Sequence, residues 1–178
     1  MMHQEIIIAG FGGQGILSAG RLLAYAGMLE NKNVSWLPSY GPEMRGGTAN
    51  CHVVVTDGQV GSPILNSATS LIVMNGPSLD KFEGIIEKDG IIVIDSSLVD
   101  QKCTREDLNV FRIPATKKAL EMGNQVFANI ILLGKFIKET TIVSKESFEQ
   151  ALRKTLPEGK HNMIPEEMKA FEWGMNYS

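Results

Sequence analysis

The first 40 residues alternate between short, unbroken apolar runs and a longer stretch with helical spacing. Glu5–Ala9 is β-branched, apolar and ended by glycines, which is typical of a strand covered on both faces. Small and apolar residues recur at helical spacing over residues 16–29, which predicts a helix packed closely on a sheet. Residues 34–37 predict a second strand that Pro38 ends. The chain therefore opens with a βαβ unit.

The middle of the chain predicts a sheet that is not purely parallel. The dipeptide Asp57-Gly58 separates two extended runs, 51–56 and 59–61, as in a two-residue β-hairpin. Such a hairpin predicts antiparallel pairing within an otherwise alternating α/β pattern. The later pattern predicts strands at 70–74, 90–95 and 110–113 and a helix at 78–86.

The last third of the chain is predicted to be helical, over residues 115–122, 126–138, 144–156 and 165–175. Ser144 is placed to cap the third of these helices, with Val143 and Phe148 at the flanking hydrophobic positions. The helix at 126–138 is apolar nearly all round, so it is either deeply buried or pressed against another chain, and we expect a shared interface. The whole pattern predicts a three-layer, Rossmann-like α/β fold with a mixed, mostly parallel sheet that includes a β-hairpin.

Length, composition and charge narrow the possible classes of protein. The 178 residues suit a single domain over 1–178, and 43% hydrophobic with 21% charged residues excludes disorder. The net charge of -3, without a dense basic run, argues against a nucleic-acid or anionic-membrane partner. No apolar stretch approaches the roughly 20 residues that span a bilayer, and we expect a cytoplasmic location. With only two cysteines, we expect no zinc or iron–sulfur centre on this chain alone.

A glycine-rich loop follows the first predicted strand directly and precedes the first predicted helix. It fits the pattern GxGxxG, in which glycines allow close backbone approach and the helix amides favour an anion such as a phosphate. A tight turn without a ligand is the alternative. A dinucleotide site is disfavoured, because Leu37 and Pro38 stand where an acidic residue is expected. The candidate binding residues of this loop are Gly10, Gly12, Gly13, Gln14 and Gly15.

A second candidate segment leaves the carboxyl end of the second predicted strand, where open α/β sheets bind ligands. Arg45 offers a planar fork for a carboxylate or phosphate, and Glu43 can orient it. Gly46 and Gly47 let backbone amides approach a ligand or a partner chain. The alternative is an ordered surface loop with a local ion pair between Glu43 and Arg45.

These two segments carry a family resemblance that spans nearly the whole chain. The stretches GFGGQGILSAGRLLA and WLPSYGPEMRGGTANCHVVV, with a later helix at 129–134, resemble the gamma subunit of 2-oxoacid:ferredoxin oxidoreductases. The resemblance is closest to the 2-oxoglutarate and branched-chain 2-oxoacid types. It implies a non-catalytic subunit of a complex that converts a 2-oxoacid and coenzyme A to acyl-CoA and carbon dioxide while reducing ferredoxin.

The resemblance also implies which partners carry the cofactors. Thiamine diphosphate with Mg²⁺ would lie on a beta subunit, beside an alpha subunit, and [4Fe-4S] clusters would lie mainly on the other subunits, including a ferredoxin-like delta subunit. Ferredoxin and coenzyme A would be ligands of the complex, 2-oxoglutarate is the expected substrate, and we expect the isolated chain to be inactive and to self-associate. A free-standing nucleotide-binding module remains the alternative function.

The remaining polar candidates favour structural roles. His3, His52 and His161 do not form a catalytic set with an acid and a nucleophile, and Cys51 lies inside a predicted strand as a small hydrophobic residue. Asp95 ends a strand, where capping of a turn or helix is favoured over contact with a ligand.

Overall fold

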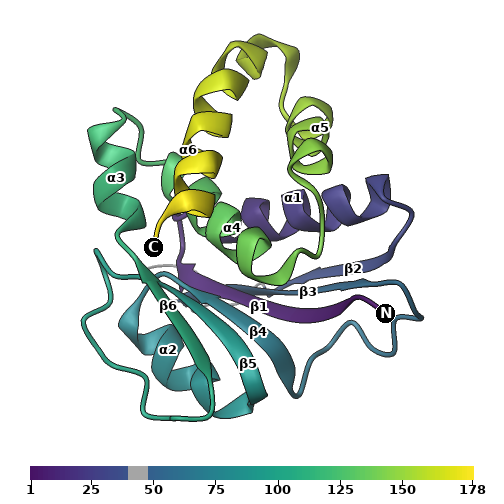
Figure 1. Cartoon of the computed structure of the whole chain (residues 1–178), viewed down its shortest axis with the longest axis vertical. Coiled ribbons are helices and arrows are strands. Elements are labelled where there is room, and N and C mark those ends of the chain that lie inside the picture. The colour runs from purple at the N-terminus through teal and green to yellow at the C-terminus, as the bar shows by residue number, and fades with distance from the viewer. Residues whose placement is uncertain (40–47) are drawn as a thin grey trace.

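A six-stranded sheet with helices on both faces forms the body of the structure, a computed structural model that describes residues 1–39 and 48–178 (Figure 1). The strand order is β2-β3-β1-β4-β5-β6. The strands are β1 (His3–Phe11), β2 (Asn33–Pro38), β3 (Thr48–Thr56), β4 (Ala68–Val73), β5 (Ile86–Asp95) and β6 (Asn109–Ile113). The helices are α1 (Ile16–Leu29), α2 (Gly76–Phe82), α3 (Ala115–Glu121), α4 (Phe127–Thr140), α5 (Lys145–Thr155) and α6 (Ile164–Asn176). Short 3₁₀ turns cover Glu83–Ile85 and Glu158–Met163.

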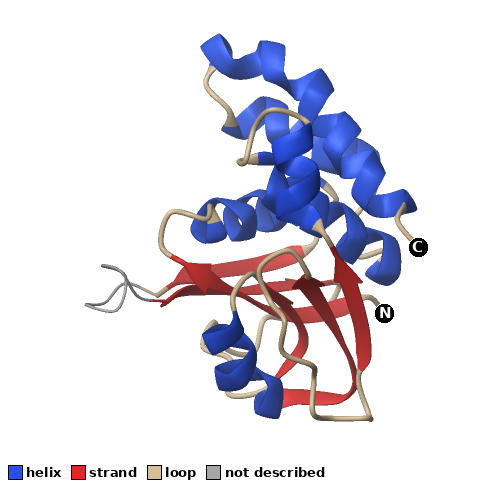
Figure 2. Cartoon of the chain, turned by 90° about the vertical axis from the view of Figure 1, so that its left-hand side faces the viewer, coloured by secondary structure: helices blue, strands red, loops and turns tan. Residues whose placement is uncertain are grey.

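The central strand β1 is covered on both faces, as its continuous apolar run predicts. Ile6 and Ile8 belong to the larger core, under α1 and α4, whereas Ile7 and Ala9 belong to the smaller core, against α2. Successive side chains of a strand point to opposite faces, so a strand buried on both sides is apolar throughout. Figure 2 shows the resulting layers, with most helices on one face of the sheet and α2 on the other.

The sheet is mixed, as predicted, but its antiparallel part is built differently. β1 pairs with β4 in parallel and with β3 antiparallel, and β3 pairs antiparallel with β2. The predicted hairpin at Asp57-Gly58 is wrong, because residues 59–61 form no strand. Asp57 instead binds the start of the chain: its N–H donates to the Met2 carbonyl at 2.9 Å, and its carboxylate accepts from the Met2 N–H at 2.8 Å.

The apolar helix α4 is buried within its own chain, so the expected shared interface along it is not what the structure shows. Every residue from Phe127 to Ile137 is buried, between the sheet and α6. α4 and α6 approach so closely that a Cβ on Gly134 would collide with the Phe171 carbonyl oxygen, and one on Gly174 with the Ile131 carbonyl oxygen. The all-round apolar pattern therefore reflects a central position in the helical layer.

The predicted start of α5 is confirmed. Ser144 Oγ accepts a hydrogen bond from the Ser147 N–H at 3.1 Å, and Val143 and Phe148 are both buried beside it. The Ser144 N–H donates to Glu30 at 2.7 Å, which ties the start of α5 to the end of α1. Partial burial would raise the pKa of Glu30, but hydrogen bonds from Ser144 and Lys32 outweigh it and hold this pKa below its usual range.

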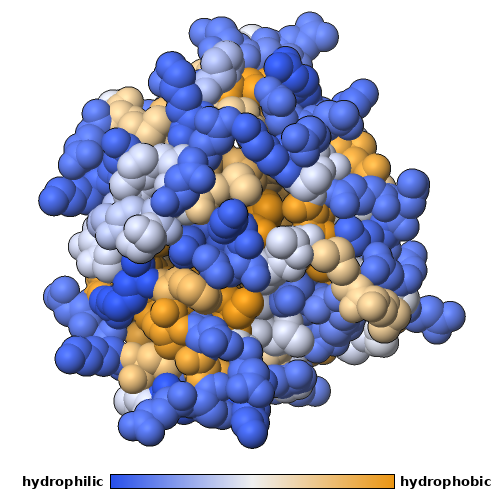
Figure 3. Space-filling view, in the orientation of Figure 1, coloured by the Kyte–Doolittle hydropathy of each residue, from blue (hydrophilic) through white to orange (hydrophobic). Residues whose placement is uncertain are grey.

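The surface of the described residues is largely hydrophilic, with apolar areas between charged side chains. On one face, hydrophobic atoms gather over the region of β5, β6 and α2 and again between the sheet and α4 (Figure 3). The larger exposed apolar side chains include Phe11, Leu37, Leu98, Leu120 and Val126. Within the described part of the chain, no helix has the length and hydrophobicity to cross a membrane.

The α4–α6 contact generates the first prediction. Gly134→Ala and Gly174→Ala should each lower the free energy of unfolding by about 1–3 kcal/mol, because the added methyl group meets a backbone carbonyl that cannot move independently. Thermal unfolding should show a loss of about 2–4 °C in melting temperature per kcal/mol. Gly159→Ala is the matched control, because nothing lies within 4 Å of its added Cβ. Melting temperatures equal to that of the control would show that the two helices can move apart freely.

Candidate functional site

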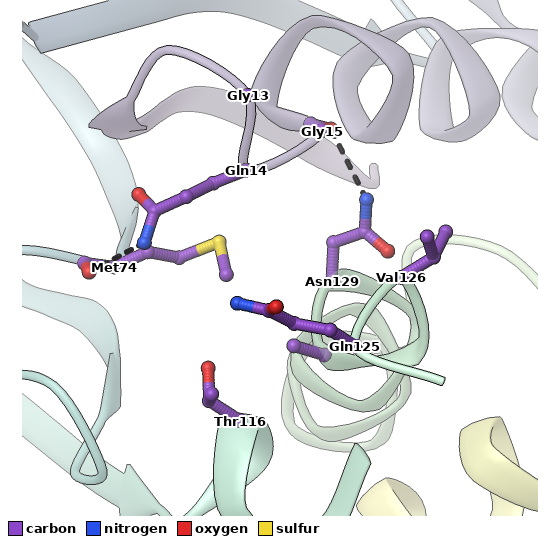
Figure 4. Close-up of a pocket in the computed structure, with 9 residues that line it drawn as sticks. Gly13, Gln14, Gly15, Met74, Thr116, Gln125, Val126 and Asn129 are labelled. Carbon is purple, nitrogen blue, oxygen red and sulfur yellow. Dashed lines mark hydrogen bonds between the residues drawn. The ribbon is translucent and has the colours of Figure 1, made fainter. Parts of the chain in front are cut away.

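A crevice of about 210 Å³ lies at the carboxyl ends of β1 and β4. These parallel neighbours are followed by helices on opposite faces of the sheet, α1 and α2, so the crevice lies at the point where open α/β sheets bind ligands. Figure 4 shows side chains from separate elements converging there. Its lining consists of Gly13, Gln14, Gly15, Met74, Thr116, Gln125, Val126, Ala128 and Asn129.

Two glycines of the Gly loop have a left-handed backbone conformation. Gly13 and Gly15 have φ values of 88° and 75°, in the left-handed region that glycine adopts without a steric cost. Gly15 is the N-cap of α1, and no side chain in residues 1–39 or 48–178 caps this helix. Because the first N–H groups of a helix have no partner within it, this end of α1 can donate to an anion or a polar ligand.

Gln14 connects the Gly loop to two strands. Its Oε1 accepts from the Phe11 N–H at 2.5 Å, and its Nε2 donates to the Met74 carbonyl at 3.4 Å. Gly10 is packed against this side chain, since a Cβ there would collide with Gln14 Oε1 and would lie 2.8 Å from Ile16 Cδ1. Gln14 therefore holds the loop against the ends of β1 and β4, and Gly10 leaves the room for it.

Asn129 is a site residue that the sequence motifs do not reveal. It lies near the start of α4, and its Nδ2 donates to the Gly15 carbonyl at 3.1 Å (Figure 4). Its Oδ1 is buried and has no hydrogen-bond partner among the described residues. A buried acceptor without a partner costs about 1–3 kcal/mol, so a ligand that donates to Asn129 is favoured here. Its signals in the sequence are a polar side chain within an otherwise apolar helix and a place in the stretch 129–134 that takes part in the family resemblance.

Thr116 completes the lower wall of the crevice and is held by Asp95. The Thr116 hydroxyl donates to Asp95 Oδ2 at 2.5 Å, and the Thr116 N–H donates to Oδ1 at 3.3 Å. The Ser97 N–H also donates to Asp95, at 3.1 Å. The predicted capping role of Asp95 is therefore confirmed: this carboxylate organises the turn after β5 and the start of α3.

None of the described residues that line the crevice carries a charged side chain. Among the described residues, attraction for an anion comes from backbone N–H groups and side-chain amides. The candidates Glu43, Arg45, Gly46 and Gly47 lie outside the described residues. The flanks of their segment are placed: Thr48 pairs with Phe11, and the Ser39 N–H donates to the Asn50 carbonyl at 2.9 Å. Both flanks therefore lie at the end of the sheet where β1 stops and the Gly loop begins.

The other polar candidates have structural environments. Burial raises the pKa of the Cys51 thiol to about 12, so it is not a nucleophile at neutral pH. His52 accepts from the Leu65 N–H at 3.0 Å, and burial lowers its pKa. His161 contacts the Leu156 carbonyl at 3.0 Å. In residues 1–39 and 48–178, no group of three or more His, Cys, Asp or Glu side chains is arranged to hold a metal ion.

Comparisons with known proteins point to one family. A family model described as pyruvate ferredoxin/flavodoxin oxidoreductase matches residues 5–177. The ketoisovalerate oxidoreductase subunit VorA of Methanothermobacter marburgensis is 40% identical over 175 residues, which cover 98% of this chain but only 36% of that protein. The 2-oxoglutarate synthase subunit KorC of Methanocaldococcus jannaschii is 37% identical over 161 residues, which cover 89% of this chain and 86% of that one.

A solved structure agrees with these relatives. The keto/oxoacid ferredoxin oxidoreductase gamma subunit of Geobacter sulfurreducens superposes with a TM-score of 0.85 and 29% identity, over 98% of this chain and 95% of that one. The resemblance found in the sequence is therefore confirmed. The relatives include both a ketoisovalerate and a 2-oxoglutarate type, so they do not separate the two substrates.

The contact between Gly15 and Asn129 generates the second prediction. Gly13→Ala and Gly15→Ala both place a side chain in the left-handed region, at a cost of about 1–2 kcal/mol. Only at Gly15 does the new Cβ also collide with Asn129 Nδ2, whereas nothing lies within 4 Å at Gly13. Urea unfolding should therefore show the larger loss of stability for Gly15→Ala. Combining it with Asn129→Ala should recover the collision part, and equal losses for the two single variants would contradict this contact.

Proposed function

Because the chain belongs to the pyruvate ferredoxin/flavodoxin oxidoreductase family, we propose that residues 1–178 form one gamma-type domain of a 2-oxoacid:ferredoxin oxidoreductase complex. The complex converts a 2-oxoacid and coenzyme A to acyl-CoA and carbon dioxide and passes the electrons to ferredoxin. We take 2-oxoglutarate as the expected substrate, with 2-oxoisovalerate and pyruvate as alternatives. Its partners are alpha, beta and ferredoxin-like delta subunits, in the cytoplasm.

The residues present favour a supporting role rather than the redox chemistry itself. Two cysteines cannot provide the four thiolates of an iron–sulfur cluster, and Cys51 is buried in β3. A thiamine diphosphate site usually has a Gly-Asp-Gly motif. The nearest match in this chain is Thr56-Asp57-Gly58, and its Asp57 is engaged with the start of the chain through Met2. Neither cofactor fits this chain alone, so we place thiamine diphosphate, Mg²⁺ and the clusters on the other subunits.

The observation that carries the proposed role is the crevice at the end of β1 and β4. It joins uncapped N–H groups of α1 to the buried acceptor of Asn129, and the Gly loop that forms one wall begins at Phe11, which pairs with Thr48 at one flank of the segment that contains Arg45. We propose that this edge contacts a phosphate-bearing ligand, coenzyme A or thiamine diphosphate, that a neighbouring subunit also holds. Exposed Phe11 and Leu37 at the same edge are available to a second chain, whether a partner subunit or another copy.

Reconstitution tests the proposed function. The purified chain alone should not reduce a redox dye with any 2-oxoacid and coenzyme A, whereas the complex with alpha, beta and delta subunits should. Omitting this chain should abolish or strongly reduce the activity, and adding it back should restore it. Rates with 2-oxoglutarate, 2-oxoisovalerate and pyruvate identify the substrate. Failure to co-purify with such subunits, together with nucleotide binding by the free chain, would favour the free-standing module instead.

Arg45 generates a further prediction, made from its residue type and its place in the sequence. Arg45→Lys should impair the complex as much as Arg45→Ala, because an ammonium group cannot reproduce the bidentate contact of a guanidinium with a phosphate. Loss of a charge-assisted hydrogen bond corresponds to about 1.5–3 kcal/mol, or roughly a 10- to 150-fold rise in the Michaelis constant for the ligand. Steady-state kinetics measure this change, and gel filtration checks assembly. An unchanged Michaelis constant with weakened assembly would instead assign Arg45 to a subunit contact.

A further inference from the structure

A second pocket, of about 270 Å³, lies within the helical layer and is separate from the Gly-loop crevice except for two shared residues. Its walls come from α1, α4, α5, α6 and the 3₁₀ turn before α6. Ligand pockets for larger molecules are commonly about 300–1,000 Å³, so this one suits a small molecule rather than a nucleotide. Its lining consists of Ser18, Ala19, Arg21, Leu22, Val126, Asn129, Ile130, Leu152, Thr155, Leu156, Lys160 and Glu167.

Two lining residues contribute buried acceptors without a partner. Glu167 is 4% exposed, and its Oε2 has no hydrogen-bond partner among the described residues. Asn129 is 7% exposed, and its Oδ1 likewise has no hydrogen-bond partner among the described residues. Burial raises the pKa of Glu167, and the charge of Lys160 opposes this rise only in part. A buried carboxylate oxygen without a donor is costly, so a ligand that donates a hydrogen bond to Glu167 Oε2 is favoured in this pocket.

The rest of the lining divides into an apolar wall and a basic rim. Leu22, Ile130 and Leu152 are buried in the core beside the pocket. Arg21 and Lys160 are exposed and form no ion pair with any residue that the structure describes. The pocket therefore combines an acidic acceptor, an apolar surface and a basic entrance.

We propose that this pocket binds a small apolar α-amino acid, such as leucine. Its ammonium group donates to Glu167 and Asn129, and its side chain packs on the apolar wall. Its carboxylate faces Arg21 and Lys160 at the entrance. Among the described residues that line the pocket, Glu167 is the only acidic one, so they do not provide the several oxygen ligands that a Ca²⁺ or Mg²⁺ site requires.

The proposed site is connected to the Gly loop through one side chain. Asn129 lines both pockets, and its Nδ2 donates to the Gly15 carbonyl while its buried Oδ1 has no hydrogen-bond partner among the described residues. A ligand that donates to Oδ1 fixes the Asn129 side chain and with it the contact to Gly15. Occupancy of this pocket is thereby communicated to the crevice. The inference does not depend on the proposed reaction, because it uses only the residues of this chain.

Calorimetric titration of the full chain tests the proposal with four related probes. Leucine should bind most tightly. Isoamylamine, which lacks the carboxylate, should bind more weakly, and 4-methylpentanoate, which lacks the ammonium, should be weaker still. The corresponding 2-oxoacid, 4-methyl-2-oxopentanoate, should also bind poorly, because it offers no donor to Glu167. This ranking is measured on the unaltered protein, so it does not require a variant that folds.

Substitutions then assign the contact. Glu167→Gln keeps the shape but removes the charge, and the dissociation constant for leucine should rise by about 10-fold or more. Glu166→Gln is the matched control: this neighbour pairs at 2.8 Å with Lys169 on the exposed side of α6, and its removal should leave binding unchanged. The proposal is overturned if leucine shows no binding with a dissociation constant near or below about 1 mM. It is also overturned if the 2-oxoacid binds as well as leucine, or if both variants behave alike.

Discussion

The hydrogen bonding of β1 on both of its edges is the constraint on which the rest of the structure depends. One edge pairs in parallel with β4 and the other antiparallel with β3, so every connection from this strand must leave at its ends. Helices then cover both faces, and Ile6, Ile7 and Ile8 are almost completely excluded from solvent. Because α1 and α2 follow the two parallel neighbours on opposite faces, a crevice forms at the carboxyl ends of these strands, and the starts of α3 and α4 complete its wall. This arrangement requires a sharp turn between β1 and α1, and the backbone of the Gly loop makes that turn.

Most of the fold was predictable because local patterns and tertiary packing agree. The continuous apolar run of β1, the small residues of α1 and the Ser144 cap each specify one structure by themselves. The hairpin failed because the turn chemistry of Asp57-Gly58 is also compatible with another partner. β3 pairs along its whole length with β1, and Asp57 is used to bind Met2. These contacts join residues that are far apart in the sequence, so a local window of ten residues does not reveal them.

The sequence identifies only the part of the site that is contiguous along the chain. Gly13, Gln14 and Gly15 are contiguous, so their motif marks the loop directly. Thr116 and Asn129 reach the same crevice from α3 and α4, more than 100 residues later in the chain, and each lies in an ordinary helical segment. The apolar pattern of α4 was open to two interpretations, burial or an interface. The close approach of its Gly134 to α6 decides for burial, which is information about packing that periodicity does not contain.

Asn129 shows why a polar residue is retained in a helix that is otherwise buried. One half of its amide is used within the chain, since Nδ2 holds the Gly15 carbonyl and so fixes the N-cap of α1. The other half has no partner among the described residues, a cost that an apolar residue of similar size would avoid. A helix that needed only to fill the core would not carry this cost. The proposed ligand contact rests on this unsatisfied oxygen, because a donor that enters either pocket would complete the hydrogen bonding of α4 and the Gly loop together.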